Sequence, residues 1–367
     1  MTERELTDWI RFCHFEILPE KANELLEYFH YDIGELLKSE TYLSGQFEQN
    51  AGRQLERYNY WKNKDLSEDL KFISDNDVQV IPCVSDKYPR KLKNIYDPPP
   101  VIFAKGTAEF NTDAPVLSVV GSRKADYYGL SVAETISRDL SRNGFIIVSG
   151  GARGIDSAAH RGSLAGGGVT WSVFGCGVCV DYPKENSLLF MDIAASGGAL
   201  VSEYLPRSDI AKFRFPMRNR IIAGLCDAIL VIQAPAQSGA LITAGYGREY
   251  GSDVFAVPGN VDDDRNSGTN ALIKDGCALI ETADDVAFNM GYTVLEATVP
   301  GGERVPALEP GEQRIFDLIT TKPVNTEYIM QQTGLPVTEV NIALTYLELK
   351  GVIKRVPGNC FVRSVLS

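Results

Sequence analysis

The sequence predicts an α/β protein with a parallel sheet, an N-terminal helical domain and a C-terminal winged-helix-like domain. Three observations carry this prediction. Apolar segments alternate with helical stretches from about residue 115 to 285, which is typical of a parallel sheet covered on both faces. Residues 1–75 repeat apolar side chains at helical spacing. Residues 311–367 contain three helical stretches and then a hairpin pattern.

The central region, residues 76–288, is predicted to contain the sheet. Two short strands, 78–84 and 100–105, flank a proline-rich turn. Six further strands follow: VLSVVG (116–121), FIIVSG (145–150), VTWSVFG (169–175), ALVSE (199–203), AILVIQA (228–234) and DVFAVPG (253–259). The polar, Pro/Gly-rich stretch at 289–310 is interpreted as a linker to the domain at 311–367, whose hairpin turns at Pro-Gly-Asn.

Most of these strands end in glycine-rich turns, which read VVGSR, VSGGARG, VFGCG, IQAPAQSGA and VPGN. Ligands of open parallel sheets bind beyond the carboxyl ends of the strands. Glycine lets a backbone approach a ligand, and helix N-termini favour anions. The alternative is that these glycines only make tight turns, but five on one edge favour a ligand site.

Composition narrows the class of protein. The chain of 367 residues has a formal net charge of −12, which by itself argues against nucleic acid, although a local basic patch can override it. The seven cysteines include a single CxxC pair, Cys176 and Cys179, without further ligands at zinc spacing. We expect no metal, no cofactor, no membrane span and a cytoplasmic protein with reduced thiols.

Three kinds of phosphate ligand fit the stretch IIVSGGARGIDSAAHRG. A dinucleotide is disfavoured because Ser149 replaces the first glycine of the G-x-G-x-x-G fingerprint. A mononucleotide is a better candidate, since FPMRNR and APAQSGALITAG resemble the layout of phosphoribohydrolases, but that loop carries no carboxylate for hydrolysis. Nucleic acid is the third candidate.

The nucleic-acid interpretation depends on RSDIAKFRFPMRNR, residues 207–220. This segment carries five cations against one acid and interleaves two phenylalanines, the composition of a groove that follows a sugar–phosphate backbone and stacks bases. The alternative is a solvated charged loop. His160 is expected to be a hydrogen-bonded histidine facing the sheet, and Asp156 to fix a turn or helix rather than to catalyse.

A series of motifs in order resembles the family of DNA-processing protein A, also called Smf. The motifs are VVGSRKADYYG, VSGGARGIDSAAH, GCGVCVDYPKEN, LVSEYLP, FPMRNRIIAGL, SGALITAGYGREYG, VFAVPGN and GTNALIKDG. The resemblance implies an extended Rossmann-like fold without catalytic activity. It also implies a homodimer that binds and protects single-stranded DNA and helps load a strand-exchange recombinase in natural transformation.

The resemblance also implies which residues meet the DNA. Lys212 should pair with phosphate, Phe215 should stack on a base, and Asn219 either joins the pocket or fixes its loop. Arg218 and Arg220 should line the same pocket. The full expected DNA-binding set is Gly121, Ser122, Arg123, Gly150, Gly151, Arg153, Gly154, Lys212, Phe215, Arg218, Asn219, Arg220, Ser238 and Gly239.

The chain departs from the family pattern in several places. Cys179, Gln233 and Ser252 replace residues that are usually ionisable, which weakens an enzymatic interpretation further. The N-terminal stretch HFEILPEKANELL lacks a hairpin glycine, so residues 1–75 are interpreted as a structural or protein-interaction module. The third helix of the C-terminal domain mixes Asn and Lys with Glu, and favours protein interaction over weak duplex contact.

Overall fold

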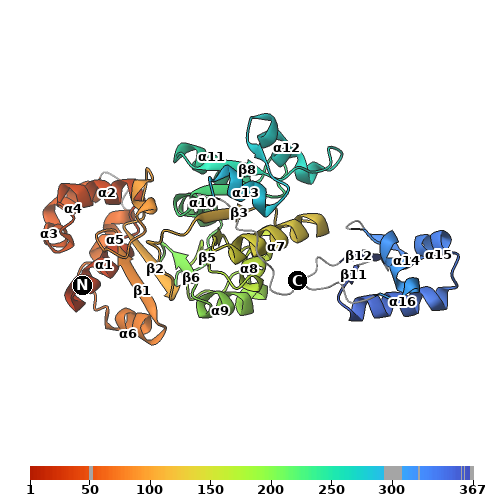
Figure 1. Ribbon diagram of the computed structural model, residues 1–367. Coiled ribbons are helices and arrows are strands. Elements are labelled where there is room, and N and C mark those ends of the chain that lie inside the picture. The colour runs from red at the N-terminus through yellow and green to blue at the C-terminus, as the bar shows by residue number, and fades with distance from the viewer. Residues whose placement is uncertain (49–52, 293–307, 321–322, 357, 359, 364–367) are drawn as a thin grey trace. The chain divides into compact units, whose positions relative to one another are not determined.

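The computed structural model describes residues 1–48, 53–292, 308–320, 323–356, 358 and 360–363. The chain forms two compact units, of which the second contains Asp126–Ser131 and the described residues from 308 onward (Figure 1). The expected linker at 289–310 lies mostly outside the described residues, as do two residues of the expected hairpin turn, Pro357 and Asn359. No helix of the described residues is long and apolar enough to cross a membrane.

The N-terminal helices form a layer built around aromatic side chains. α1 begins with a capping box between Thr2 and Glu5, which satisfies N–H groups of its first turn. Phe15 is buried in edge-on contacts with Phe47 and Tyr58, whose rings lie tilted against each other. The helices are α1 (Glu3–His14), α2 (Pro19–Tyr28), α3 (Ile33–Lys38), α4 (Glu40–Glu48), α5 (Arg53–Trp61) and α6 (Ser67–Asp75).

A nine-stranded sheet follows in the order β1-β2-β6-β5-β4-β3-β7-β8-β9. The strands from β6 to β9 pair in parallel, while β2 is antiparallel to both β1 and β6, so the sheet is mixed and mostly parallel. The strands are β1 (Val78–Pro82), β2 (Val101–Gly106), β3 (Val116–Val120), β4 (Ile146–Ser149), β5 (Thr170–Val173), β6 (Ala199–Ser202), β7 (Ala228–Val231), β8 (Asp253–Ala256) and β9 (Ala278–Leu279).

Both faces of the central strands are buried, which explains why these strands are mostly apolar, with small hydroxyl residues such as Ser118 and Thr170 among them. In β2, Ile102 and Ala104 face the cluster that includes residues of α10 and α11, whereas Val101 and Phe103 face the N-terminal helices and α9. The helices after β3 are α7 (Tyr127–Arg142), α8 (Ile155–Ala165), α9 (Ser187–Ala195), α10 (Arg214–Gly224), α11 (Gly239–Glu249), α12 (Ser267–Lys274) and α13 (Ala283–Asn289).

The C-terminal unit has three helices and a small antiparallel sheet of order β10-β12-β11, the arrangement of a winged helix. Its core is aliphatic, with Ile315, Ile329 and Val340 fully buried. The elements are α14 (Pro310–Leu318), β10 (Val324–Asn325), α15 (Thr326–Thr333), α16 (Val337–Leu349), β11 (Ile353–Val356) and β12 (Cys360–Arg363).

Candidate nucleic-acid interface

The loops that follow β3 and β4 pack against each other at the carboxyl edge of the sheet. Ile155, the first residue of α8, donates its N–H to the carbonyl of Ser122 at 3.2 Å. Gly154 adopts a positive φ of 81°, and a Cβ atom there would overlap the same Ser122 carbonyl. This glycine is therefore required by the contact between the two loops.

The neighbouring glycines are also explained by protein contacts. A Cβ on Gly150 would lie 2.7 Å from the Arg218 guanidinium, and one on Gly121 or Gly151 would overlap a neighbouring side chain. Gly239 differs, because no atom lies within 4 Å of its Cβ position. Tight packing thus accounts for the first four glycines, whereas for Gly239 the expectation that it makes room for a ligand stays a prediction.

Arg218 lies beneath this edge and is 3% exposed. Its Nη1 donates to the carbonyl of Gly150 at 2.8 Å and to that of Val173, at the ends of β4 and β5. Burial lowers the pKa of Arg218 to about 10, although the nearby Asp156 carboxylate favours the charge. Arg218 therefore remains charged at neutral pH and fixes two strand ends.

Asp156 is the buried acid of the same edge. Burial raises its pKa, while Arg218 and the N–H of Ala152, which donates to Asp156 Oδ2 at 3.3 Å, oppose that rise. The expectation that Asp156 fixes the turn is confirmed by this hydrogen bond.

An aromatic and cationic cluster forms where α10 begins. The guanidinium carbon of Arg123 lies 5.6 Å from the centroid of the Phe215 ring, and Tyr182 lies 5.4 Å from it on another segment. These three residues, with Arg153 and Arg218, line a small cavity of about 60 Å³. Tyr182 is a member that sequence reasoning missed, since only the fold brings its loop beside α10.

A larger cavity of about 290 Å³ adjoins the first, and both are lined by Arg123 and Arg218. We call the two cavities together the sheet-edge pocket. Asn219 borders it and donates its Nδ2 to the carbonyl of Gly239 at 3.1 Å, so its expected role of fixing the loop is confirmed. The expected residues that line the sheet-edge pocket are Gly121, Ser122, Arg123, Gly150, Arg153, Phe215, Arg218, Asn219, Ser238 and Gly239.

Arg220 does not line the sheet-edge pocket, so the expectation that it shares a pocket with Arg218 is wrong. Its side chain is 1% exposed and bonds Asp97 Oδ2 at 2.7 Å and Glu203 Oε2 at 2.6 Å. Burial works against its charge, but the two carboxylates outweigh burial and raise the pKa of Arg220. Arg220, Asp97 and Glu203 are therefore expected to stay paired, because leaving a buried charge unpaired costs free energy.

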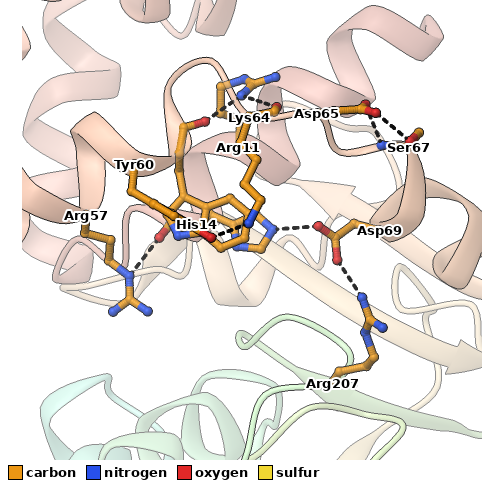
Figure 2. Close-up of polar contacts among 10 residues, drawn as sticks. Arg11, His14, Arg57, Tyr60, Lys64, Asp65, Ser67, Asp69 and Arg207 are labelled. Atoms are coloured by element: carbon orange, nitrogen blue, oxygen red, sulfur yellow. Dashed lines mark hydrogen bonds and ion pairs between the residues drawn. The ribbon is translucent and has the colours of Figure 1, made fainter.

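The N-terminal module holds another cation of the basic segment. Figure 2 shows Asp69 between two partners, the Nη2 of Arg207 at 3.0 Å and the Nε2 of His14 at 3.1 Å. His14 in turn stacks on Trp61, with 3.7 Å between ring centroids. Burial lowers the pKa of His14, although Asp69 opposes that shift.

The remaining cations of this region differ in their partners. Arg214 lies 3.5 Å from Glu16 of the N-terminal module, and Arg153 forms an exposed ion pair with Glu185. Lys212 is exposed on the segment before α10, forms no ion pair with the described residues and lines neither cavity. No local sequence signal shows these pairings, since Glu16 lies almost 200 positions before Arg214.

His160 is fully buried on α8 and faces the sheet as expected. Its Nδ1 lies 2.7 Å from the Thr170 hydroxyl, which itself donates to the carbonyl of Ile147 at 2.7 Å. Nδ1 therefore carries the proton and donates it to the Thr170 hydroxyl. The buried Nε2 has no hydrogen-bond partner among the described residues, so only one of the two ring nitrogens is hydrogen-bonded as expected. Burial and the nearby Arg161 and Arg218 lower the pKa of His160 to about 3.

α16 presents an apolar face in the C-terminal unit. Ile342, Tyr346 and Leu349 are exposed at helical spacing, and the cation Lys350 pairs with Glu312. A helix that reads DNA exposes basic and amide side chains instead. The exposed residues of α16 therefore support the interpretation of this unit as a protein-interaction domain.

The sequence is similar to known proteins along most of its length. Residues 79–291 match the family of DNA recombination-mediator protein A, and residues 302–359 match the DprA winged helix domain. The DNA processing protein DprA of Bacillus subtilis is 40% identical over 231 residues, covering 63% of this chain and 77% of that protein. Protein Smf of Escherichia coli is 31% identical over 313 residues, covering 83% of each.

Two solved structures share the fold. DNA processing protein A from Streptococcus pneumoniae superposes with a TM-score of 0.64 at 34% identity, covering 77% of this chain and 96% of that one. DNA processing protein A from Helicobacter pylori, described for its single-stranded DNA binding mode, superposes with a TM-score of 0.53 at 26% identity, covering 60% and 99%. The chain therefore belongs to the family of DNA recombination-mediator protein A, with a Rossmann-like sheet and a winged helix domain.

Proposed function

We propose that this protein binds single-stranded DNA in the sheet-edge pocket and acts as a non-catalytic mediator of recombination. The observation that carries the proposal is the cluster of Arg123, Tyr182 and Phe215, where the exposed Arg123 lies over the Phe215 ring and Tyr182 packs against that same ring. Cations next to aromatic rings suit a strand whose phosphates need charge and whose unpaired bases need a stacking surface.

Exposed cations that form no ion pair explain how a chain with a negative net charge can bind an anionic ligand. Arg123 and Lys212 are exposed, and neither forms an ion pair with the described residues. The charge of −12 belongs to the whole chain. We infer that the positive potential is confined to the edge of the sheet, and that the acidic remainder disfavours nonspecific binding to duplex DNA.

The relatives support the proposal. The matched family is described as a recombination mediator, and the Helicobacter pylori structure is described for its single-stranded DNA binding mode. By analogy, the chain protects single-stranded DNA in the cytoplasm, works as a homodimer and hands the DNA to a strand-exchange recombinase during natural transformation. A dimer would present two sheet-edge pockets to one strand and add avidity.

A nucleotide-binding enzyme or sensor of the phosphoribohydrolase kind is the second candidate. The observation that favours it is Asp156, a buried carboxyl group with a raised pKa that borders the larger cavity. Against it, Asp156 Oδ2 already accepts a hydrogen bond from Ala152, as a turn-fixing residue does. Release of ribose 5-phosphate from AMP would support this candidate, and none is expected.

The test is fluorescence anisotropy of a labelled single strand and of the matching duplex at several salt concentrations, with the full chain. We expect the single strand to bind more tightly and the binding to weaken as salt rises. Phe215→Ala should weaken binding by about 1–3 kcal/mol if the ring stacks on a base. Equal affinity for duplex and single strand, or no dependence on salt, would contradict the proposal.

A further inference from the structure

A third cavity lies beyond the sheet-edge pocket, where the N-terminal helices meet the sheet. It has a volume of about 240 Å³. One wall comes from α1, α2 and the turn between them, and the other from the segment 203–217 after β6 and from the residues that lead into β2. All of these residues belong to one compact unit. We call this space the module cavity.

The module cavity offers apolar surface and no unpaired charge. Phe12, Leu205 and Met217 are among the side chains of its walls. The acids that reach it are compensated, because Glu203 pairs with Arg220, and Glu16 bonds the N-terminal module's Arg57 and lies 3.5 Å from Arg214. Such a site suits a flat neutral group and disfavours a phosphate.

Phe213 lies at this cavity and is 66% exposed, so its ring is accessible to a ligand. Beside it, the Arg214 guanidinium lies 4.3 Å from the Tyr204 ring and 6.0 Å from the Phe213 ring. Phe215, two residues later, lines the sheet-edge pocket instead. The start of α10 thus presents one aromatic ring to each of two cavities.

The cavities also follow one another along the edge of the sheet. The strand order places β6 and β2 directly beyond β5 and β4, whose ends bond Arg218, and Phe215 lies against Gly175 just after β5. The end of β6 and the start of antiparallel β2 lie at the same edge, and both border the module cavity. Two strand spacings are roughly 10 Å, which a stacked single strand covers in about three nucleotides.

We propose that the module cavity receives one nucleobase of the strand that crosses the sheet-edge pocket, with Phe213 stacked on that base. This inference depends on the proposed function, and it gives the N-terminal module a direct part in DNA binding. A base is the expected occupant because it is flat and neutral, while the phosphates of the same strand remain with Arg123 and Lys212 outside the cavity.

The test compares oligonucleotides of increasing length on the full-length protein, each carrying 2-aminopurine at one position. Phe213→Ala should bind the shortest oligonucleotides like the unchanged protein and bind longer ones about 5- to 150-fold more weakly, the range of base–aromatic stacking. Phe213→Tyr should retain the affinity. One 2-aminopurine position should be quenched in the unchanged protein and released in Phe213→Ala.

Phe288→Ala is the matched control, because Phe288 is 82% exposed on α13 and borders neither cavity. The inference is overturned if Phe213→Ala binds every length like the unchanged protein while Phe215→Ala binds all lengths weakly, and this result leaves the proposed function intact. It is also overturned if Phe213→Ala weakens all lengths equally. If the unchanged protein binds no oligonucleotide, the proposed function fails with it.

Discussion

The exposed rim of the sheet and the buried layer directly beneath it both contain cationic side chains, but only those of the rim can pair with a phosphate. We use the word rim for Arg123, on the loop after β3, and Lys212, on the segment before α10; both are exposed, and neither forms an ion pair with the described residues. Beneath it, Arg218 and Arg220 are almost fully buried, and their donors are taken by strand-end carbonyls and by two carboxylates. A count of cations in residues 207–220 therefore overstates the charge that a phosphate can meet.

The largest expected effect concerns the buried layer. Arg220→Met should lower the free energy of unfolding by about 3–5 kcal/mol, because Asp97 and Glu203 then lose their buried partner. Urea denaturation measures the loss. Binding of single-stranded DNA by the molecules that remain folded should be unchanged.

The double variant Arg220→Met with Glu203→Gln provides the control for Arg220. It should recover part of the lost stability, since the amide removes one of the uncompensated charges. If Arg220→Met lowered the free energy of unfolding by less than about 1 kcal/mol, the ion pairs of Arg220 would behave like surface ion pairs. The difference between the buried layer and the exposed rim would then not hold.

A smaller effect comes from His160, which shares the buried layer. Its folded pKa of about 3 lies below its unfolded value, so below about pH 6.5 the unfolded chain binds a proton that the folded chain does not. Stability should therefore fall as the pH decreases from 6 to 5. His160→Asn should flatten this dependence by up to about 1.4 kcal/mol per pH unit in urea titrations. If the dependence of stability on pH were unchanged in His160→Asn, it could not be attributed to His160, and His14 would account for all of it.

The rim itself should affect binding and not stability. Arg123→Ala and Lys212→Ala should each weaken binding of single strands regardless of sequence, and should reduce the slope of log affinity against log salt by about 0.7. Salt titrations by anisotropy measure the slope, and thermal melting should show no change. If both variants keep the salt slope of the unchanged protein, then Arg123 and Lys212 do not contact the phosphates of the DNA.

The smallest effect should come from Arg153, which is exposed like Arg123 but is paired with Glu185. Arg153→Ala should change the salt slope by less than Arg123→Ala does, because Glu185 already compensates the charge. The variant Glu185→Gln is the matched control and should tighten binding slightly. A slope change for Arg153→Ala equal to that for Arg123→Ala would mean that DNA displaces the carboxylate.

The order of elements could be predicted because it follows from local periodicity. The alternating apolar strands and the three C-terminal helices occur in the structure close to their expected positions, since a parallel strand that is buried on both faces is mostly apolar. The strand order and the antiparallel pairing of β2 could not be predicted, because they depend on which strands meet in space.

The sequence by itself determined the family, the Rossmann-like sheet, the winged helix and the gathering of glycine-rich turns at one edge, because these follow from periodicity and contiguous motifs. Only the tertiary structure decided which cations are available. Asp69, Asp97 and Glu16 come from distant parts of the chain to hold Arg207, Arg220 and Arg214. An ion pair depends on the separation and burial of two groups in space, and sequence distance constrains neither.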